Sequence, residues 1–207
     1  MKLRQYEKSE LTKERILEAA VDEFAEKGFY GARVDAIAEA SGINKRMLYA
    51  HFESKEKLYA KVLLIAYEWI AARERECMVE DEDPIDAIKG FVNMTFDFLL
   101  ENPKFIRLLM WENLNRAVSI PKDELVKLKE PTFEYIRQKI RLGKKLGTVR
   151  ESVDEHQIVL SVMSFAFAYF SNAHTMSALM DRNLTSRENV LRRSEFISDM
   201  IVKYLEA

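Results

Sequence analysis

Apolar residues recur every three or four positions along most of this 207-residue chain. That spacing is the period of an amphipathic α-helix, whereas strands alternate apolar and polar residues. Six glycines and four prolines interrupt the pattern, and these residue types are the strongest breakers of regular structure. The pattern therefore predicts an all-α fold with no internal repeat.

Capping residues predict where several of these helices begin and end. Thr12 is a suitable N-cap for a helix that closes at Gly28, since glycine adopts the left-handed conformation common after a last turn. The dipeptides Asp-Pro at 83–84 and Asn-Pro at 102–103 place a side-chain acceptor before a proline. A proline at the first helical position loses nothing by lacking an N–H. Two further helices are therefore expected to start at these prolines.

The last two long helices are predicted from reciprocal capping boxes. Ser152 is followed three residues later by Glu155, and Thr185 is followed three residues later by Glu188. In such a box, two side chains each accept a backbone N–H at the start of the helix. We therefore expect these helices to begin directly after Ser152 and Thr185, with the final one covering residues 187–205.

Residues 31–52 fit two short helices that meet at a turn. Gly42 lies at the turn, where a glycine adopts a positive φ at little steric cost. The second helix is expected from Asn44 to about Tyr49. The apolar positions of the pair are Ile37, Ala38, Ile43, Leu48 and Phe52. The residues that remain to face outward are Asn44, Lys45, Arg46, Met47, Tyr49 and His51.

The charge of the chain is concentrated near this turn. The net charge is -2 and the isoelectric point is near 6.0, which argues against a protein that coats nucleic acid or membrane over its whole surface. The segment 41–61, however, holds five basic and two acidic residues. Lysine, arginine and tyrosine bind DNA phosphates, Arg46 could also reach a guanine edge, and Met47 could contact a thymine methyl. The alternative is a helical hairpin whose solvent face is basic.

The segment from Thr12 to Leu63 resembles the TetR family of bacterial transcriptional regulators. The resemblance rests on a first helix that ends in FAEKGF, followed by IAEASGI and then by LYAHFESKEKLY. It implies a three-helix, helix-turn-helix DNA-binding domain at 1–54 and a helical ligand-binding and dimerisation domain at 55–207. It also implies that the protein is a repressor released from operator DNA by a small-molecule effector.

The resemblance further implies roles for single residues. In the family the third helix binds DNA, and residues at the positions of Tyr49, His51 and Lys55 hold phosphates. Arg33 and Arg46 stand where many members have small residues, and Met47 stands where threonine is frequent, so the operator cannot be copied from a relative. The DNA-binding set is thus expected to be Arg33, Asn44, Lys45, Arg46, Met47, Tyr49, His51 and Lys55.

The helix that follows links this domain to the rest of the chain. Leu58, Val62, Ile65 and Trp69 form one helical stripe behind a Ser54 cap. In the family, a ligand that shifts this helix changes the separation of two recognition helices, which must match half-sites about 34 to 36 Å apart.

The remaining chain is rich in large aromatic residues. The stretches FDFLLENPKFIRLLMWENLNRA and FAYFSNAHTMSALM resemble the regulatory domain of a TetR subgroup that includes the pyrimidine-utilisation repressor. Most of these aromatic residues are expected to form core, and a few to line a ligand cavity. For Asn115 and Arg116, a solvated helix end is the alternative. The candidate pocket residues are Trp69, Phe98, Trp111, Asn115, Arg116 and Phe133.

Residues 157–180 contain no acidic residue, lysine or arginine, a run long enough to span a bilayer. Its many serine, asparagine and threonine side chains would be poorly paired in lipid, so we expect no membrane span. With the final helix, the run resembles the four-helix dimer seam of TetR proteins, which implies a homodimer. The candidate interface residues are Phe165, Phe167, Phe170 and His174.

Other classes of function find little support. A nucleophile elbow, a phosphate-cradling glycine loop and a His-Glu-x-x-His sequence are all absent, so we expect neither an enzyme nor a cofactor. The spacing of the three histidines does not match a metal site. Cys77 is the single cysteine, and the first twenty residues are too charged for a signal peptide, which suits a cytoplasmic protein. A DNA-bound structural or partner-binding protein without an effector remains the alternative to the ligand-released repressor.

Overall fold

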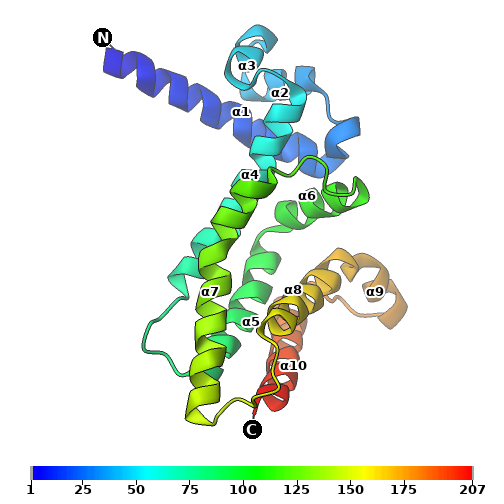
Figure 1. Ribbon diagram of the computed structural model, residues 1–207. Helices are drawn as coiled ribbons and strands as arrows, with labels where there is room; N and C mark the ends of the chain where they lie inside the picture. The colour runs from blue at the N-terminus through cyan, green and yellow to red at the C-terminus, as the bar shows by residue number, and fades with distance from the viewer. Residues whose placement is uncertain (1, 207) are drawn as a thin grey trace. The chain divides into compact units, whose positions relative to one another are not determined.

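The computed structural model describes the backbone of residues 2–206 and the side chains of residues 9–206. Within that range the regular elements are helices, joined by loops and accompanied by an antiparallel bridge between Val149 and Glu206, so the predicted all-α class is confirmed. The helices, labelled in Figure 1, are α1 (Lys2–Gly31), α2 (Val34–Ser41), α3 (Lys45–Phe52), α4 (Lys55–Glu76), α5 (Pro84–Glu101), α6 (Pro103–Leu114), α7 (Lys122–Leu146), α8 (Glu155–Ser171), α9 (Ala173–Met180) and α10 (Arg187–Leu205).

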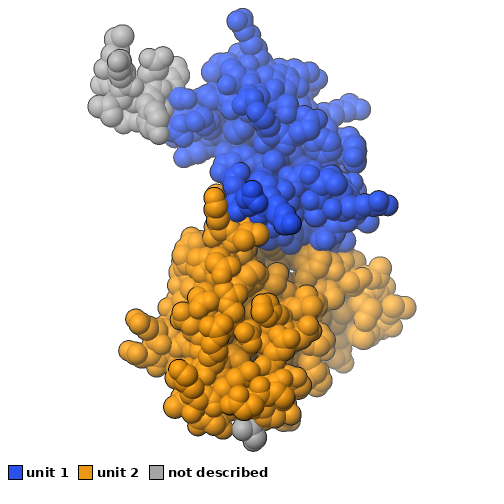
Figure 2. Space-filling model, in the orientation of Figure 1, with its two compact units in different colours: residues 1–67, 107–125 blue, residues 68–106, 126–207 orange. Residues whose placement is uncertain are grey.

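The chain divides into two compact units (Figure 2). Unit 1 comprises residues 1–67 and 107–125, and unit 2 comprises residues 68–106 and 126–207. Helices α4, α6 and α7 each contribute residues to both units. This division differs from the expected one because residues 55–67 and 107–125 group with the N-terminal helices. The domain boundary between residues 54 and 55 therefore stays a prediction.

The core of unit 1 joins α1 to the helices that follow it. The rings of Phe24 and Tyr59 lie 4.8 Å apart, and both side chains are fully buried. Helix α1 begins at Lys2, so the prediction that Thr12 opens it is wrong; Thr12 lies buried within the helix. The predicted end is confirmed, because the helical geometry is interrupted at Gly28, which has a φ of 66°. Other fully buried members of this core are Ile16, Ala20, Ile37, Leu48 and Leu58.

Unit 2 is built around α5, which packs mainly against α10 and also against α8. The predicted starts of α5 and α6 at the two prolines are confirmed, and the Asp83 carboxylate accepts the N–H of Ile85 at 2.8 Å. Helix α7 carries Pro131 in its interior. Proline lacks an N–H, so the carbonyl of Lys127 has no α-helical donor at this point.

The caps of the last long helices differ from the two predicted boxes. Asp154 caps α8, and its carboxylate accepts the N–H of His156 at 2.8 Å. Ser186 caps α10, and its hydroxyl accepts the N–H of Asn189 at 3.4 Å. Both helices begin close to where they were expected, but Ser152 and Thr185 are not the caps.

The uncharged run at 157–180 is not one helix. It is divided at Asn172, where α8 ends and α9 begins. The amide of Asn172 donates to the carbonyl of Ala168 at 2.9 Å, which satisfies a carbonyl of the last turn of α8. Among the described residues, no helix has the length and apolar character needed to cross a membrane.

Candidate nucleic-acid interface and ligand cavity

The turn between α2 and α3 is held by backbone geometry at Gly42. This residue adopts the left-handed conformation, with φ 65° and ψ 25°, and its N–H donates to the carbonyl of Glu39 at 3.0 Å. A side chain at this position would also meet Arg15, whose Nη2 lies 2.7 Å from the position of a Cβ. Glycine is therefore favoured here by its φ, whereas the Arg15 guanidinium, at the end of a flexible side chain, could move aside.

Asn44 fixes the start of α3. Its side-chain oxygen accepts the N–H of Met47 at 2.8 Å, which satisfies one of the unpaired donors of the first turn. The helix runs Lys45–Phe52, beginning one residue later and ending further on than expected. The side-chain oxygen of Asn44 accepts the capping hydrogen bond, so its NH₂ group is the part that remains available to donate to DNA.

Helix α3 buries one side and exposes the other. Leu48 is fully buried in the core of unit 1. The residues on the opposite side are exposed, and they match the outward positions expected from the sequence. They are Lys45, Arg46, Met47 and Tyr49, while His51 is half-buried.

Two lysines of this surface are positioned by neighbouring groups. Lys45 forms an ion pair with Asp35 at 2.9 Å, and hydrogen bonding to that carboxylate raises the pKa of Lys45. The Nζ of Lys55 donates to the carbonyl of Ala32 at 2.6 Å and lies 4.8 Å from the centre of the Phe29 ring. A lysine ammonium has three N–H donors. Lys55 therefore keeps donors for a phosphate while its position is set by the loop before α2.

Arg33 lies at the junction that precedes α2. Its backbone N–H donates to a carboxylate oxygen of Glu23 at 3.0 Å, and its side chain is exposed. The structure thus places Arg33 and Lys55 on neighbouring segments, because Lys55 bonds the residue directly before Arg33. It gathers the eight expected DNA-binding residues within unit 1.

Helix α6 is anchored to the C-terminal part of α1 inside unit 1. The indole N–H of Trp111 donates to the carbonyl of Ala25 at 3.3 Å, and Arg107 forms an ion pair with Glu26. The Trp111 ring also packs against Gly28, where a Cβ would lie 2.6 Å from the nearest ring atom. Trp111 is therefore a structural contact of unit 1.

The other candidate pocket residues lie in several different surroundings. Asn115 lines a shallow hollow of about 420 Å³ in unit 1, and Arg116 follows the end of α6 with a φ of 62°. In unit 2, Phe98 is buried in the core, edge-on to Phe105 with ring centres 5.2 Å apart. Phe133 lines a separate hollow between α7 and α8, and Trp69 is half-buried on α4.

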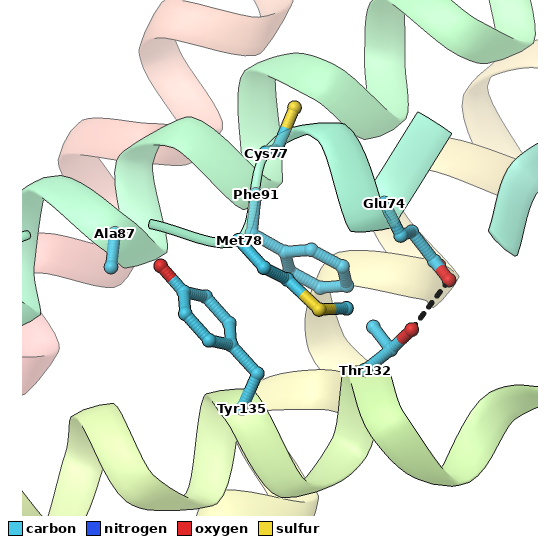
Figure 3. A pocket seen from close by; sticks show the side chains of 7 residues that line it. All are labelled: Glu74, Cys77, Met78, Ala87, Phe91, Thr132 and Tyr135. Carbon is cyan, nitrogen blue, oxygen red and sulfur yellow. Dashed lines mark hydrogen bonds between the residues drawn. The ribbon is translucent and has the colours of Figure 1, made fainter. Parts of the chain in front are cut away.

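Unit 2 contains a small cavity that the sequence analysis did not identify (Figure 3). Its walls combine apolar side chains with polar groups, which stand at its two ends. Glu74 and Thr132 lie at one end, where the Thr132 hydroxyl donates to Glu74 at 2.7 Å, and the Tyr135 hydroxyl lies at the other. The space left is about that of one water molecule. The lining residues are Glu74, Cys77, Met78, Ala87, Phe91, Thr132 and Tyr135.

An ion pair is buried beside this cavity. Glu74 is 3% exposed and Lys129 is 5% exposed, and the lysine bonds both oxygens of the carboxylate. Burial lowers the pKa of Lys129, and the Glu74 carboxylate opposes that shift. At the other end, burial and then Glu82 raise the pKa of Tyr135 to about 12, so its hydroxyl stays protonated at neutral pH. The cavity therefore offers a carboxylate and two hydroxyl groups, and the Lys129 ammonium lies behind the carboxylate.

The outward side of α8 and α10 exposes large apolar side chains. Of the four residues proposed for a dimer seam, Phe170 is buried in its own unit, with its ring centre 6.1 Å from that of Phe96. Phe165 and Phe167 are half-buried, and His174 is exposed. Exposed apolar residues that the sequence analysis did not single out are Leu160, Met163, Phe196, Met200 and Tyr204.

The fold and this surface define a helix-turn-helix DNA-binding protein with a helical C-terminal domain. The model of the bacterial regulatory proteins of the tetR family matches residues 16–62. The model of the tetracyclin repressor-like C-terminal domain matches residues 84–201, more than half of the chain. The chain belongs to the TetR family of bacterial transcriptional regulators, as its motifs predicted.

Similar proteins agree with this assignment. The HTH-type transcriptional repressor NicS of Pseudomonas putida KT2440 is 29% identical over 200 residues, which cover 96% of this chain and 94% of NicS. RutR of Escherichia coli K12 is 37% identical over 106 residues, 51% of this chain and 49% of RutR, so the likeness to the subgroup of the pyrimidine-utilisation repressor is confirmed. The crystal structure of the Streptomyces coelicolor regulator SCO4942 has a TM-score of 0.69 and 26% identity, and covers 94% of this chain and 98% of its own.

Proposed function

We propose that this protein is a homodimeric, cytoplasmic repressor that binds double-stranded operator DNA through α3 and leaves it when a small-molecule effector binds. The observation that carries the proposal is the exposed row of Lys45, Arg46, Met47 and Tyr49 on a capped helix behind the turn at Gly42. Regulatory relatives along nearly the whole chain support a regulator in preference to an enzyme.

The residues of this surface divide into two roles. Tyr49, His51 and Lys55 are proposed to hold phosphates, which position the protein without reading sequence. Arg46 and Met47 are proposed to read base edges, because arginine binds guanine and an apolar tip contacts the thymine methyl. Lys45, in the first turn of α3, is held by its ion pair with Asp35 of α2.

The proposed effector site is the cavity of unit 2 in Figure 3. Effector sites combine apolar walls with a few convergent polar groups, and this cavity has both, although it is much smaller than an occupied site. Its present size admits about one water, so an effector would need the walls to separate. Glu74, at one end of the cavity, and Lys55, in the DNA-binding surface, lie on the same helix α4. A displacement of α4 by the effector is therefore proposed to reach the DNA-binding surface.

The effector and operator DNA must each weaken the binding of the other by the same factor. An effector releases DNA only if it binds the released conformation better than the DNA-bound one. Operator DNA must then weaken effector binding by the same factor as the effector weakens DNA binding, about 5 to 150-fold for a typical coupling.

The test has two stages. Selection from randomised duplexes should yield an operator, bound in fluorescence anisotropy with an affinity that falls as salt rises. Failure to select any sequence from a folded dimer would refute the DNA-binding role. A thermal-shift screen should then find a compound that stabilises the protein by about 2.7 kcal/mol at 100 times its dissociation constant. Equal affinity of that compound with and without operator would instead favour a DNA-bound protein that no effector regulates.

A further inference from the structure

An acidic side chain lies within the proposed DNA-binding surface. Asp35 stands in the first turn of α2, and its Oδ1 lies 2.9 Å from the Nζ of Lys45, the first residue of α3. The pair is open to solvent, since the side chain of Asp35 is 75% exposed and that of Lys45 is 51% exposed. An exposed ion pair contributes little to stability, and DNA phosphates repel a carboxylate. The fold therefore has little need of an aspartate at this position.

Each member of the ion pair keeps hydrogen-bonding groups for a further partner. A lysine ammonium has three N–H donors, and one of them serves Asp35, which leaves two. A carboxylate has two oxygens, and Lys45 contacts Oδ1, so Oδ2 can accept from another donor. The pair thus presents two donors beside an acceptor.

This order of groups matches the major-groove edge of a G·C base pair. Guanine presents the acceptors N7 and O6, and cytosine presents the N4 donor beside them. Cytosine N4 also donates to guanine O6 within the pair, so these two atoms are about 2.9 Å apart. The Nζ of Lys45 and the Oδ1 of Asp35 have the same separation. In an A·T pair the donor N6 of adenine follows N7, so the lysine would meet a donor instead of a second acceptor.

We propose that Asp35 and Lys45 together read one G·C base pair in each half of the operator. Lys45 donates to guanine N7 and O6, and Asp35 accepts from cytosine N4. The N-terminal residues of a recognition helix contact base edges in the major groove. Lys45 is the first residue of α3, and the ion pair holds Asp35 of the preceding helix beside it. The inference rests on the proposed DNA-binding function and adds Asp35 to it as a specificity-determining residue.

The same carboxylate disfavours other sequences. Where another base pair takes this position, Asp35 loses the cytosine donor, and an acceptor without a donor in an interface is costly. Its charge also lowers the attraction of the surface for phosphates, whatever the sequence. A repulsive element of this kind increases discrimination and reduces affinity for unrelated DNA. Asp35→Ala should therefore bind random duplexes at least as tightly as the wild type while discriminating less between base pairs.

The experiment changes single atoms of the operator that the wild-type chain selects from randomised duplexes. N4-methylcytosine lacks the N4 hydrogen that faces the major groove, and 7-deazaguanine lacks the N7 acceptor. At the pair read by Asp35 and Lys45, we expect each change to raise the wild-type Kd in anisotropy titrations at least about fivefold. The effect of N4-methylcytosine should fall below about twofold in Asp35→Ala, and that of 7-deazaguanine should do so in Lys45→Met. Glu151→Ala, which removes an exposed acidic residue of unit 2, is the control and should keep both wild-type effects.

The outcomes separate this base contact from DNA binding itself. A folded wild-type dimer that selects no sequence would overturn both. An operator in which no G·C pair responds to N4-methylcytosine would overturn the role of Asp35 and leave DNA binding intact, and this measurement requires no variant. Asp35→Ala that binds all DNA more weakly but keeps the wild-type response to N4-methylcytosine would make Asp35 a structural residue and also overturn it. A response that is lost in Asp35→Ala and kept in Glu151→Ala would support the proposal.

Discussion

Replacing Lys129 by methionine should destabilise unit 2 more than any surface change. The variant would leave the Glu74 carboxylate, only 3% exposed, with a hydrogen bond from the Thr132 hydroxyl and without its ammonium partner. Breaking a buried ion pair by removing one member costs about 3–5 kcal/mol, because the other charge stays buried and uncompensated. For a chain of this length, that loss corresponds to a fall in melting temperature of about 6–20 °C.

The double variant Glu74→Leu/Lys129→Met is the informative comparison. It removes both charges, and replacing a buried pair by apolar residues of similar volume is often neutral or stabilising by about 1–4 kcal/mol. Urea unfolding followed by circular dichroism would measure the free energy of unfolding of the wild type, of Lys129→Met and of the double variant. Lys145→Met is the surface control, expected within about 0.5 kcal/mol of wild type. A loss below about 1 kcal/mol for Lys129→Met would refute the reasoning, since the pair would then be open to water.

The pH dependence of a second variant tests the same burial. In Glu74→Gln, Lys129 keeps its desolvation but loses the carboxylate that opposes the lowering of its pKa. Below its ordinary pKa of 10.5 the unfolded chain then binds more protons than the folded chain, so the free energy of unfolding rises with pH. We expect the deficit of Glu74→Gln relative to wild type to shrink as the pH increases from 7 towards that value. A deficit that is constant with pH would contradict this account.

The remaining predictions concern DNA binding, unit 1 and the dimer. Lys55→Ala should flatten the slope of log affinity against log salt by about one unit, and an unchanged slope in anisotropy titrations would remove Lys55 from the interface. Arg46→Ala should cost about 1–3 kcal/mol at one base pair of the operator, whereas a uniform loss over all operators would make it a phosphate contact. Gly28→Ala should destabilise unit 1 in urea unfolding, because a Cβ meets the Trp111 ring and φ is 66°; wild-type stability would show that the ring moves aside. Phe167→Glu should produce monomers by sedimentation if α8 lies in the seam, and a dimeric variant would place the seam elsewhere.

Features set by neighbouring residues could be predicted from the sequence. The turn at Gly42, the cap at Asp83 and the end of regular helix at Gly28 each depend on a few consecutive residues, and all three were predicted. The caps at Asp154 and Ser186 were missed because a serine or threonine one or two residues earlier has a glutamate three positions on and so matches the capping box.

Features that depend on distant segments could not be predicted in this way. Glu74 and Lys129 are 55 residues apart, and a charged residue is expected on a solvent face unless its partner is known. One signal was present, since Lys129 falls on the same helical stripe as Thr132, Ile136 and Ile140, all of which are buried. The position of Trp111 against Gly28 could not be predicted from periodicity either, because the two residues are 83 positions apart in the sequence.

Pro131 leaves one turn of α7 beside the cavity with one backbone hydrogen bond fewer. It lies between Lys129 and Thr132, the two residues that hold Glu74, and it leaves the carbonyl of Lys127 without a helical donor. Amide hydrogens in this turn should therefore exchange with solvent faster than those in the following turns of α7, since the opening involves one backbone hydrogen bond fewer. Separating Lys129 from Glu74 would then require motion of one weakened turn, on a timescale of about microseconds to milliseconds, while the rest of the helix stays folded.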